Sequence, residues 1–548
     1  MKKFVSMLLA LLMLIALLPM NAIAEEAEDL VPVPARVVSK RTDGLKAEPA
    51  TKSIKAGGSG TCGDDLTWTL DDEGTLTISG TGAMANYSSS RAPWYSMRSS
   101  IKKIAICDSV TTIADYAFIG CDSLTEVTIG DSVTTIGEDA FLFCPSLKAF
   151  TVSADNPKYK DIDGVLFNKA CTTLIQYPAG RTETTYTIGD FVTTIGDYAF
   201  SDCVSLEEVT IGDSVTTIGE DAFAFCTSLK AFTVSADNPK YKDIDGVLFN
   251  KACTTLIQYP AGRTETTYTI GDSVTTIGDD AFEYCTSLTE VTIGESVTTI
   301  GDFAFFYCTS LTTVTIGDSV TTIGWMAFYD CTSLEEVTIP DSVTTIGDSA
   351  FEDCTSLEEV TIGDSVTTIG DYAFLRCTSL TEVTIGESVT TIRDHAFSGC
   401  TSLTEVTIPA SVTTIGDMAF AWCDSLNTVI FEGEPPTSFG EDVFDDCGGR
   451  FTIYYYPKHE SAWAPNGETT WNGYSIEPLD LILYGDVNLD GIVNAADATV
   501  VLRSVVGMNT LSETQLLAAD VNYDGKVDAA DAAMILRYVV GMVESIEP

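Results

Sequence analysis

The chain has 548 residues and a formal net charge of −50, because 79 Asp and Glu outnumber 29 Lys and Arg. So acidic a surface repels nucleic acid and anionic membranes, and we expect neither as a partner. Hydrophobic residues make up 45% of the sequence, which is enough for a large core and excludes disorder for most of the chain.

The first residues have the pattern of an export signal. Two lysines precede the apolar run 4–18, and Ala22-Ile23-Ala24 supplies small residues for cleavage. We expect a signal peptide over 1–24 and a secreted, extracellular mature protein. The apolar run is too short for a membrane span, and no second one follows it. Residues 25–60 lack periodicity and end in glycines, which predicts a flexible leader.

The middle of the chain repeats every 23 residues. The unit at 288–308 begins with three apolar residues spaced as Leu-x-x-Val-x-Ile and ends at Cys308. A period of this length with this opening predicts a leucine-rich-repeat solenoid. We expect the first apolar set to point inward from a strand and a second one to fill the back of the coil. The two sets are Leu288, Val291 and Ile293, then Val297, Ile300, Ala304 and Phe305.

Two longer units interrupt the period. Residues 138–197 recur almost unchanged at 220–279, which indicates a tandem duplication. In the first copy, the apolar runs 165–167 and 173–175 predict a β-hairpin that protrudes from the solenoid. The turn after the strand carries Gly294 in one unit and Pro340 in another, so we expect a φ near −65° there.

The pattern Val-Thr-Thr-Ile-Gly-Asp-x-Ala-Phe-x-x-Cys recurs in copy after copy and resembles the BspA-like leucine-rich repeat family. This resemblance implies a mainly β solenoid over 107–431, flanked by an N-terminal cap over 61–106 and a C-terminal cap over 432–481. Caps are also physically necessary, because open coil ends would expose core residues and strand edges. The family is associated with adhesion and protein binding.

Sixteen cysteines in an exported chain raise the question of disulfides. Most recur once per coil, three residues after a core Phe, so we expect a buried ladder of free thiols. Neighbouring coils are close enough for disulfides, and that alternative stays open. The strand face carries columns of Thr and Glu. They are either a ligand-binding surface or residues kept for strand propensity and solubility, and their uniformity favours the second reading.

Catalysis has little support in the sequence. The two histidines are His395 and His459, and His395 occupies a freely varying position where we expect a solvated side chain. The carboxylates fall at repeated positions, whereas an active site needs a singular constellation. We therefore predict that the chain is not an enzyme, although counting alone does not exclude a glycosidase-type carboxylate pair.

Two copies of a loop rich in oxygen ligands close the chain. They start at Asp486 and Asp520, and side-chain oxygens stand at loop positions 1, 3, 5, 9 and 12 with glycine at position 6. A hard cation such as calcium requires this arrangement. Helices are expected over 495–506 and 529–540, each ended by glycine, with a short helix near Ser512 between them. Residues 481–485 are expected to be extended.

The duplicated loops with a missing leading helix resemble a type I dockerin over 482–548. The resemblance implies two Ca²⁺ ions and a cohesin module of a scaffoldin as partner. It assigns the metal ligands Asp486, Asn488, Asp490, Ile492, Asn494, Asp497, Asp520, Asn522, Asp524, Lys526, Asp528 and Asp531, with Ile492 and Lys526 acting through carbonyls. It assigns the partner contacts Ala495, Ala496, Leu502, Arg503, Ala529, Ala530, Leu536 and Arg537. The near-symmetry of the halves is compatible with binding in two orientations.

Together these features predict a secreted, non-catalytic binding or adhesion protein that docks onto a scaffoldin in a polysaccharide-degrading complex. The solenoid would bind plant cell-wall polysaccharide or a protein. One alternative is a spacer that occupies a cohesin without a ligand of its own. A polysaccharide hydrolase is the weakest alternative.

Overall fold

The structure is a computed structural model that describes residues 57–87, 92–479, 484–488, 492–511, 513–522 and 525–543. The expected signal peptide and leader residues 25–56 lie outside the described residues. The chain divides into two compact units, Met1–Glu290 with Ile300–Leu311 and Val291–Thr299 with Thr312–Pro548. None of the helices in the described ranges has the length and apolar character that crossing a bilayer needs.

The first unit opens with a cap in which β1, β2 and β3 pair antiparallel before β3 pairs parallel with β5. Strand β1 begins at Gly58, inside the segment expected to be a flexible leader, so the cap starts earlier than predicted. The cap elements are β1 (Gly58–Thr61), β2 (Leu66–Leu70), β3 (Thr75–Gly80), β4 (Gly82–Ala83), the 3₁₀ helix η1 (Tyr95–Ser100) and β5 (Lys103–Ile106).

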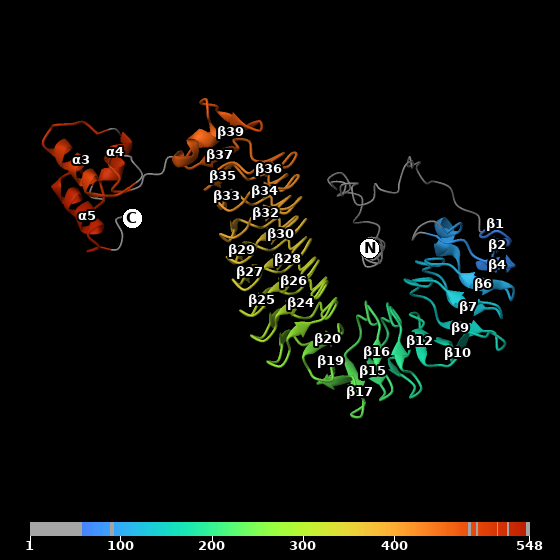
Figure 1. The fold of residues 1–548 in the computed structure, drawn as a ribbon. Helices are drawn as coiled ribbons and strands as arrows, with labels where there is room; N and C mark the ends of the chain where they lie inside the picture. Colours follow the sequence, from blue (N-terminus) through green and yellow to red (C-terminus); the bar gives the residue numbers. More distant parts are fainter. Residues whose placement is uncertain are drawn as a thin grey trace. The chain divides into compact units, whose positions relative to one another are not determined.

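The remaining strands of the first unit form stacked coils (Figure 1). They are β6 (Val110–Ile113), β7 (Glu126–Ile129), β8 (Thr135–Ile136), β9 (Ala149–Val152), β10 (Tyr159–Ile162), β11 (Val165–Asn168), β12 (Thr173–Gln176), β13 (Thr185–Thr187), β14 (Thr194–Ile195), β15 (Glu208–Ile211), β16 (Thr217–Ile218), β17 (Ala231–Val234), β18 (Tyr241–Ile244), β19 (Val247–Asn250), β20 (Thr255–Gln258), β21 (Thr267–Thr269) and β22 (Thr276–Ile277). Strands β23 (Glu290–Thr292) and β24 (Thr299–Ile300) fall where the two units divide.

The second unit continues the same coil pattern. Its strands are β25 (Thr313–Thr315), β26 (Thr322–Ile323), β27 (Glu336–Ile339), β28 (Thr345–Ile346), β29 (Glu359–Ile362), β30 (Thr368–Ile369), β31 (Glu382–Thr384), β32 (Thr391–Ile392), β33 (Glu405–Ile408), β34 (Thr414–Ile415), β35 (Thr428–Phe431), β36 (Ser438–Phe439), β37 (Thr452–Tyr455), β38 (Thr470–Trp471) and β39 (Tyr474–Pro478). Its helices are η2 (Pro457–His459), α2 (Glu460–Trp463), α3 (Ala495–Val505), α4 (Glu513–Ala519) and α5 (Ala529–Val539).

Each coil contributes a strand to two parallel sheets. Along one of them Glu336 pairs with Glu359, and Glu359 with Glu382, in the register set by the 23-residue repeat. The other sheet pairs β26, β28, β30, β32, β34 and β36 in the same way. The mainly β solenoid predicted from the repeat is confirmed.

Stacked aromatic rings run through the core of the regular coils. The rings of Phe351 and Phe374 lie 5.2 Å apart and parallel, and the same spacing separates Phe374 from Phe397. In the first unit, a separate run of stacked rings begins at the buried Trp94, whose indole donates a 2.7 Å hydrogen bond to the carbonyl of Ala117. Trp94 closes the open end of the core, a role that the sequence analysis missed.

The duplicated insertion does not protrude, which corrects the sequence prediction. Strands β10, β11 and β12 do pair antiparallel, but β12 then pairs parallel with β14 of the following coil. Val165, Leu166 and Phe167 are at most 2% exposed. The three-stranded insertion is therefore part of the solenoid wall, because its apolar side chains complete the core.

The cysteines form the expected ladder. All 16 are thiols outside any disulfide, and most are buried. The thiol of Cys377 donates to the carbonyl of Phe351 at 3.3 Å, and Cys400 repeats this bond to Phe374 at 3.3 Å. Burial raises the pKa of the Cys377 thiol, which keeps it protonated and unreactive.

The back of each coil contains two residues with positive φ, four positions apart. Tyr372 and Arg376 have φ of 60° and 57°, and His395 has φ of 56°. This geometry aims the N–H groups of Tyr372, Phe374 and Arg376 at carbonyls of the next coil, at 2.7–2.9 Å. The inter-coil bonds offset the strain of a left-handed conformation in non-glycine residues.

The prediction that the His395 side chain is solvated is wrong. Its side chain is 5% exposed and its ring stacks on Tyr372 at 5.0 Å and Trp422 at 6.4 Å. Burial lowers the pKa of His395. The histidine is thus a neutral part of an aromatic column rather than a solvated surface residue.

Candidate calcium centres and docking face

The C-terminal tail is built from two halves that repeat after 34 residues, and each half contributes one long helix, α3 or α5. The apolar side chains that pack between them occupy matching positions in the two halves. They are Val487, Ala498 and Val501, followed by Val521, Ala532 and Ile535. The short helix α4 lies between the halves, as predicted.

Each long helix begins with a reciprocal capping box. The Asn494 side chain accepts the N–H of Ala496 at 2.8 Å, while the Asp497 carboxylate accepts the N–H of Asn494 at 2.8 Å. Asp528 and Asp531 repeat the arrangement at α5, with distances of 2.6 and 2.8 Å. These four residues are the predicted ligands at loop positions 9 and 12, so the helix cap also holds them in place.

The loops bring carboxylates into the interior of the tail. Asp497 and Asp531 are 0% exposed and Asp486 is 4% exposed. The second oxygen of Asp497 accepts the N–H of Asn488 at 3.0 Å, which ties loop position 12 to position 3. Burial raises the pKa of Asp531, and the carboxylates of Asp520 and Asp528 raise it further.

A buried carboxylate is costly unless positive charge compensates it. The donor set consists of carboxylate, amide and carbonyl oxygens, which suits Ca²⁺. The residues therefore fit the ion. Within the described ranges no three His, Cys, Asp or Glu side chains come together as a metal cluster. The predicted ligands Asp490 and Asp524 lie outside those ranges.

The residues predicted to contact the partner are all exposed to solvent. Leu502 and Leu536 are 43% and 40% exposed, and the alanine pairs and arginines beside them are also exposed. Further large apolar side chains continue this docking face toward the helix ends, beyond what the sequence analysis named. They are Val505, Val506, Met508, Val539, Val540 and Met542.

These additional residues repeat as Val-Val-Gly-Met at the end of each half, and this repeat was a usable signal. Gly507 and Gly541 have φ of 73° and 70° and end the helices. Val506 and Met508 are 66% and 78% exposed. Exposed apolar clusters of this kind mark interaction sites.

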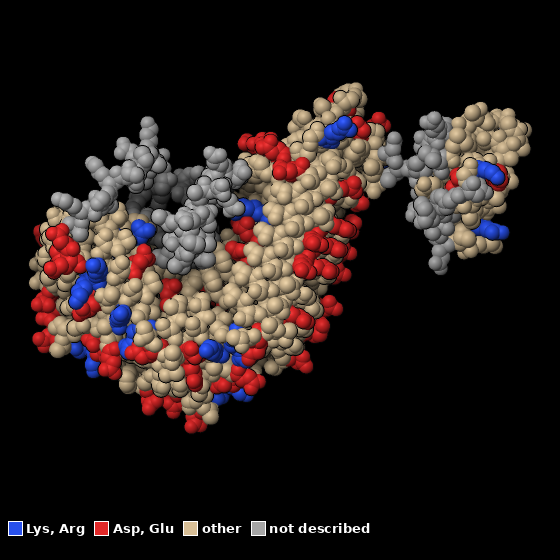
Figure 2. All heavy atoms as spheres, turned by 180° about the vertical axis from the view of Figure 1, so that it is seen from behind, with Lys and Arg blue, Asp and Glu red and all other residues tan. Residues whose placement is uncertain are grey.

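The solenoid surface carries acidic side chains in rows along the coils, with few Lys or Arg among them (Figure 2). Several of the aspartates have a structural role. Asp371 accepts the backbone N–H of Asp394 at 3.1 Å, and Asp348 does the same for Asp371 at 2.9 Å. These carboxylates tie one coil to the next, as expected for residues at a repeated position.

Comparisons with known proteins agree with the two parts of this structure. The family model described as BspA type leucine rich repeat region matches in 6 copies, at residues 94–182, 179–265, 261–381 and 321–450. These matches span more than half of the chain. The chain belongs to the BspA-type leucine-rich repeat family. The dockerin type I domain matches residues 484–540, which confirms the second resemblance.

Solved structures similar to this BspA-type chain include a leucine-rich repeat protein from Eubacterium ventriosum. It is 29% identical, with a TM-score of 0.49, over 67% of this chain and 95% of that chain. A leucine rich cell surface protein from Faecalibacterium prausnitzii is 27% identical, with a TM-score of 0.39, over 61% of this chain and 96% of that chain. A comparison with curated proteins finds no match.

Proposed function

We propose that this BspA-type chain is an exported binding protein that docks, through its calcium-dependent dockerin, onto a cohesin of a scaffoldin in a polysaccharide-degrading complex. Two Ca²⁺ ions order the tail through the twelve predicted ligands. The eight exposed contact residues named above, extended by the Val-Val-Gly-Met segments, face the cohesin. Type I dockerins are calcium-binding modules, and the match at 484–540 supports this assignment.

One observation supports the docking proposal most strongly. In each half of the tail, the same helix has a buried carboxylate at its start and an exposed leucine on its outer face. Asp497 and Asp531 are fully buried at the start of α3 and α5, while Leu502 and Leu536 are exposed on the same helices. The ion would fix the start of each helix, and the helix would present its outer face. Both halves offer this combination, which supports binding in either of two orientations.

The domain plan follows from this proposal. A signal peptide over 1–24 exports the chain, a cap and BspA-type coils over 61–431 form the recognition part, and a second cap over 432–481 leads to the dockerin at 482–548. Repeat and dockerin domains are both non-catalytic kinds, so we assign no reaction to the chain. The solenoid supplies binding or adhesion toward plant cell-wall polysaccharide or protein.

Exchange of the small residues on the docking face tests the partner assignment. We expect Ala495→Glu with Ala496→Lys, or the matching pair at Ala529 and Ala530, to leave binding to a type I cohesin nearly intact in calcium. All four exchanges together should abolish it. The Thr499→Ala variant on the same helix is the control. If either pair alone removes binding completely, the two-orientation proposal is wrong.

Incubation with insoluble fibre tests the role of the solenoid against its alternatives. The full chain should be retained on plant fibre or on an immobilised protein ligand without releasing sugar. Retention on neither material, with cohesin binding intact, would favour a spacer that only occupies cohesins. Release of reducing sugar by the purified chain would instead favour a hydrolase.

A further inference from the structure

The strand face of the solenoid changes character at its C-terminal end. The carboxylates of Glu336, Glu359, Glu382 and Glu405 follow one another on successive strands. On the next strand, β35, Glu405 pairs with Thr428, and Thr428 in turn pairs with Thr452 on β37. The neighbouring row changes from Thr407 to Ile430 and then to Tyr454 on the same strands. The repeated rows of Glu and Thr therefore end at β35, and a patch of side chains that occurs once in the solenoid takes their place.

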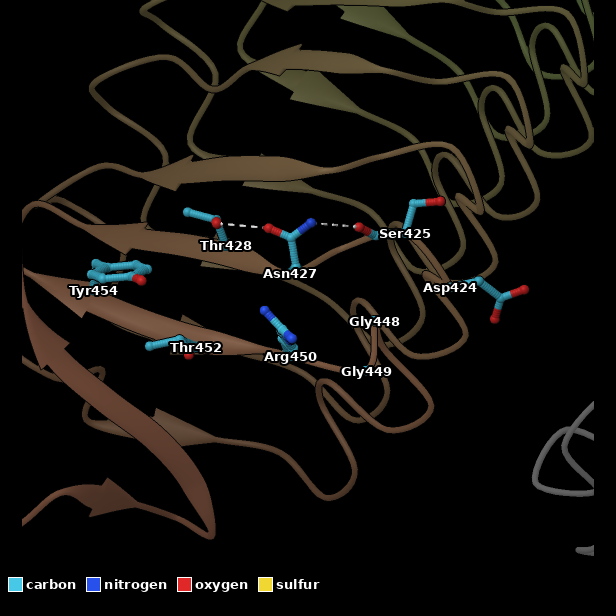
Figure 3. Close-up of a pocket in the computed structure, with 9 residues that line it drawn as sticks. All are labelled: Asp424, Ser425, Asn427, Thr428, Gly448, Gly449, Arg450, Thr452 and Tyr454. Atoms are coloured by element: carbon cyan, nitrogen blue, oxygen red, sulfur yellow. Dashed lines mark hydrogen bonds between the residues drawn. The ribbon is translucent and has the colours of Figure 1, made fainter.

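A groove of about 870 Å³ lies on this patch (Figure 3). Its volume falls in the range of small-ligand sites, about 300–1,000 Å³. In Figure 3 the Arg450 side chain lies beside Asn427, with Thr452 and Tyr454 further along β37. The lining residues are Asp424, Ser425, Asn427, Thr428, Gly448, Gly449, Arg450, Thr452 and Tyr454.

Hydrogen bonds within the protein hold polar groups of the groove in place and leave them able to bind a ligand. The Asn427 amide accepts the hydroxyl of Thr428 at 2.9 Å and donates to the carbonyl of Ser425 at 3.3 Å. Arg450 is exposed, and in the described part of the chain the arginine ion pairs are formed by others, namely Arg181, Arg263, Arg376 and Arg393. Its guanidinium carries five N–H donors, which no hydrogen bond or ion pair to another described residue occupies.

Two glycines line the groove. Gly448 approaches the carbonyl of Leu426 so closely that a Cβ there would lie 2.9 Å from the oxygen. At Gly449 a Cβ would meet no atom within 4 Å, and its φ is not positive. A side chain at Gly449, which lines the groove, therefore meets open space and does not strain the backbone.

The chemistry of the lining favours a ligand that both donates and accepts hydrogen bonds. An anion site consists of donors, whereas here a carboxylate, an amide and hydroxyls accompany the guanidinium. Carboxylates also flank the groove, because Glu405 pairs with Thr428 and Glu477 pairs with Tyr454 on the neighbouring strands. They repel a polyanion but leave a neutral polyol unaffected. The Tyr454 ring offers an amphipathic surface with an apolar face and a polar edge.

We propose that this groove on β35 and β37 is a binding site for a neutral polysaccharide chain, with the Tyr454 ring under a sugar ring and Asn427, Thr452 and Arg450 bound to hydroxyl groups. The inference rests on the proposed binding role of the solenoid and names its site and ligand class. It is independent of the dockerin.

Affinity electrophoresis of the full chain in gels that contain soluble xylan, glucomannan, mixed-linkage glucan or polygalacturonate tests the site. We expect retardation by at least one neutral polymer. Gly449→Trp should abolish it, and Tyr454→Ala should weaken it about tenfold, since stacking and burial of one ring are worth about 1.5 kcal/mol. Tyr456→Ala, outside the groove lining, is the matched control, and thermal melting checks that each variant is folded.

The outcomes separate this inference from the proposed function. If a neutral polymer retards the wild type and all groove variants equally, the solenoid binds elsewhere and the site assignment is wrong. If polygalacturonate alone retards the chain and Arg450→Gln removes the effect, the ligand class is wrong. If no polymer retards the wild type, the inference fails, while cohesin binding of the same sample decides the docking proposal.

Discussion

The solenoid and the dockerin tail keep their folds by different means. In the solenoid, parallel rings such as Phe351 and Phe374 stack at 5.2 Å, and among its described residues no Asp or Glu is 0% exposed, the most buried being Glu283 at 7%. In the tail, the fully buried set includes the carboxylates of Asp497 and Asp531. The first region is held by apolar contact repeated many times, whereas for the second we propose a dependence on a cation. The comparison teaches that, under the proposed function, one chain combines a solenoid whose fold needs no ion with a tail whose attachment is conditional.

The largest expected effect is loss of the fold of the tail. Replacement of Asp497 and Asp531 by Ala removes a ligand from each loop and half of each capping box. We expect the helical signal of the tail to be lost in calcium while the β signal of the solenoid persists, as measured by far-ultraviolet circular dichroism. Thr499→Ala is the control on α3. An unchanged helical signal in the double variant would contradict the dependence on the cation.

The next effect concerns the aromatic stack. Phe374→Ala leaves a cavity between Phe351 and Phe397, and we expect it to lower the free energy of unfolding of the solenoid by about 3–5 kcal/mol. Denaturant titration measures this change. The melting of the tail should stay as in the wild type. A parallel loss in the tail would show that the two regions unfold as one.

A smaller effect depends on pH and concerns Glu283 in the first unit. Its side chain is 7% exposed, and its carboxylate accepts the N–H of Phe225 at 3.3 Å. Burial raises its pKa well above 4.5, and the charge of Asp221 adds to this. The folded chain therefore holds a proton that the unfolded chain releases, so stability falls as the pH rises from 4.5 through the folded pKa.

Glu283→Gln should remove this loss. We expect the variant to melt at a higher temperature than the wild type at pH 8 and at nearly the same temperature at pH 4. Differential scanning fluorimetry across this range measures the difference. An equal shift at both pH values would mean that the effect comes from packing rather than from ionisation.

The smallest effect is expected on the uniform strand face. Thr384→Val keeps a β-branched side chain at an exposed position of β31, so the free energy of unfolding should change by no more than about 0.5 kcal/mol. Binding of polysaccharide should also be unchanged. A clear loss of binding would place the recognition surface on the Thr columns instead of the groove.

The repeat predicted the solenoid because every coil carries the same apolar positions, and the register then places Phe374 next to Phe351 and Phe397. The cysteine ladder followed from the same period. The loop spacing likewise predicted α3, α4 and α5. These features depend on local pattern and on identical neighbours, which are both visible in a single sequence.

Other features depend on contacts between different coils. His395 is buried because Tyr372 and Trp422 flank it, and a position that varies freely in sequence gave no sign of this. The insertion at 159–176 joins the wall because β12 pairs with β14, which sequence alone did not show. The groove was missed because Arg450 and Tyr454 belong to a cap without a repeat, and Asn427 stands in the last repeat unit, where its contact with that cap does not show in the sequence.

Calorimetric titration of a type I cohesin into the full chain, in calcium and again in a chelator, tests the central claim most directly. The account predicts tight binding in calcium and none in the chelator, with the melting temperature of the solenoid the same in both solutions. Equal binding in the two solutions, or no binding in calcium, would contradict it.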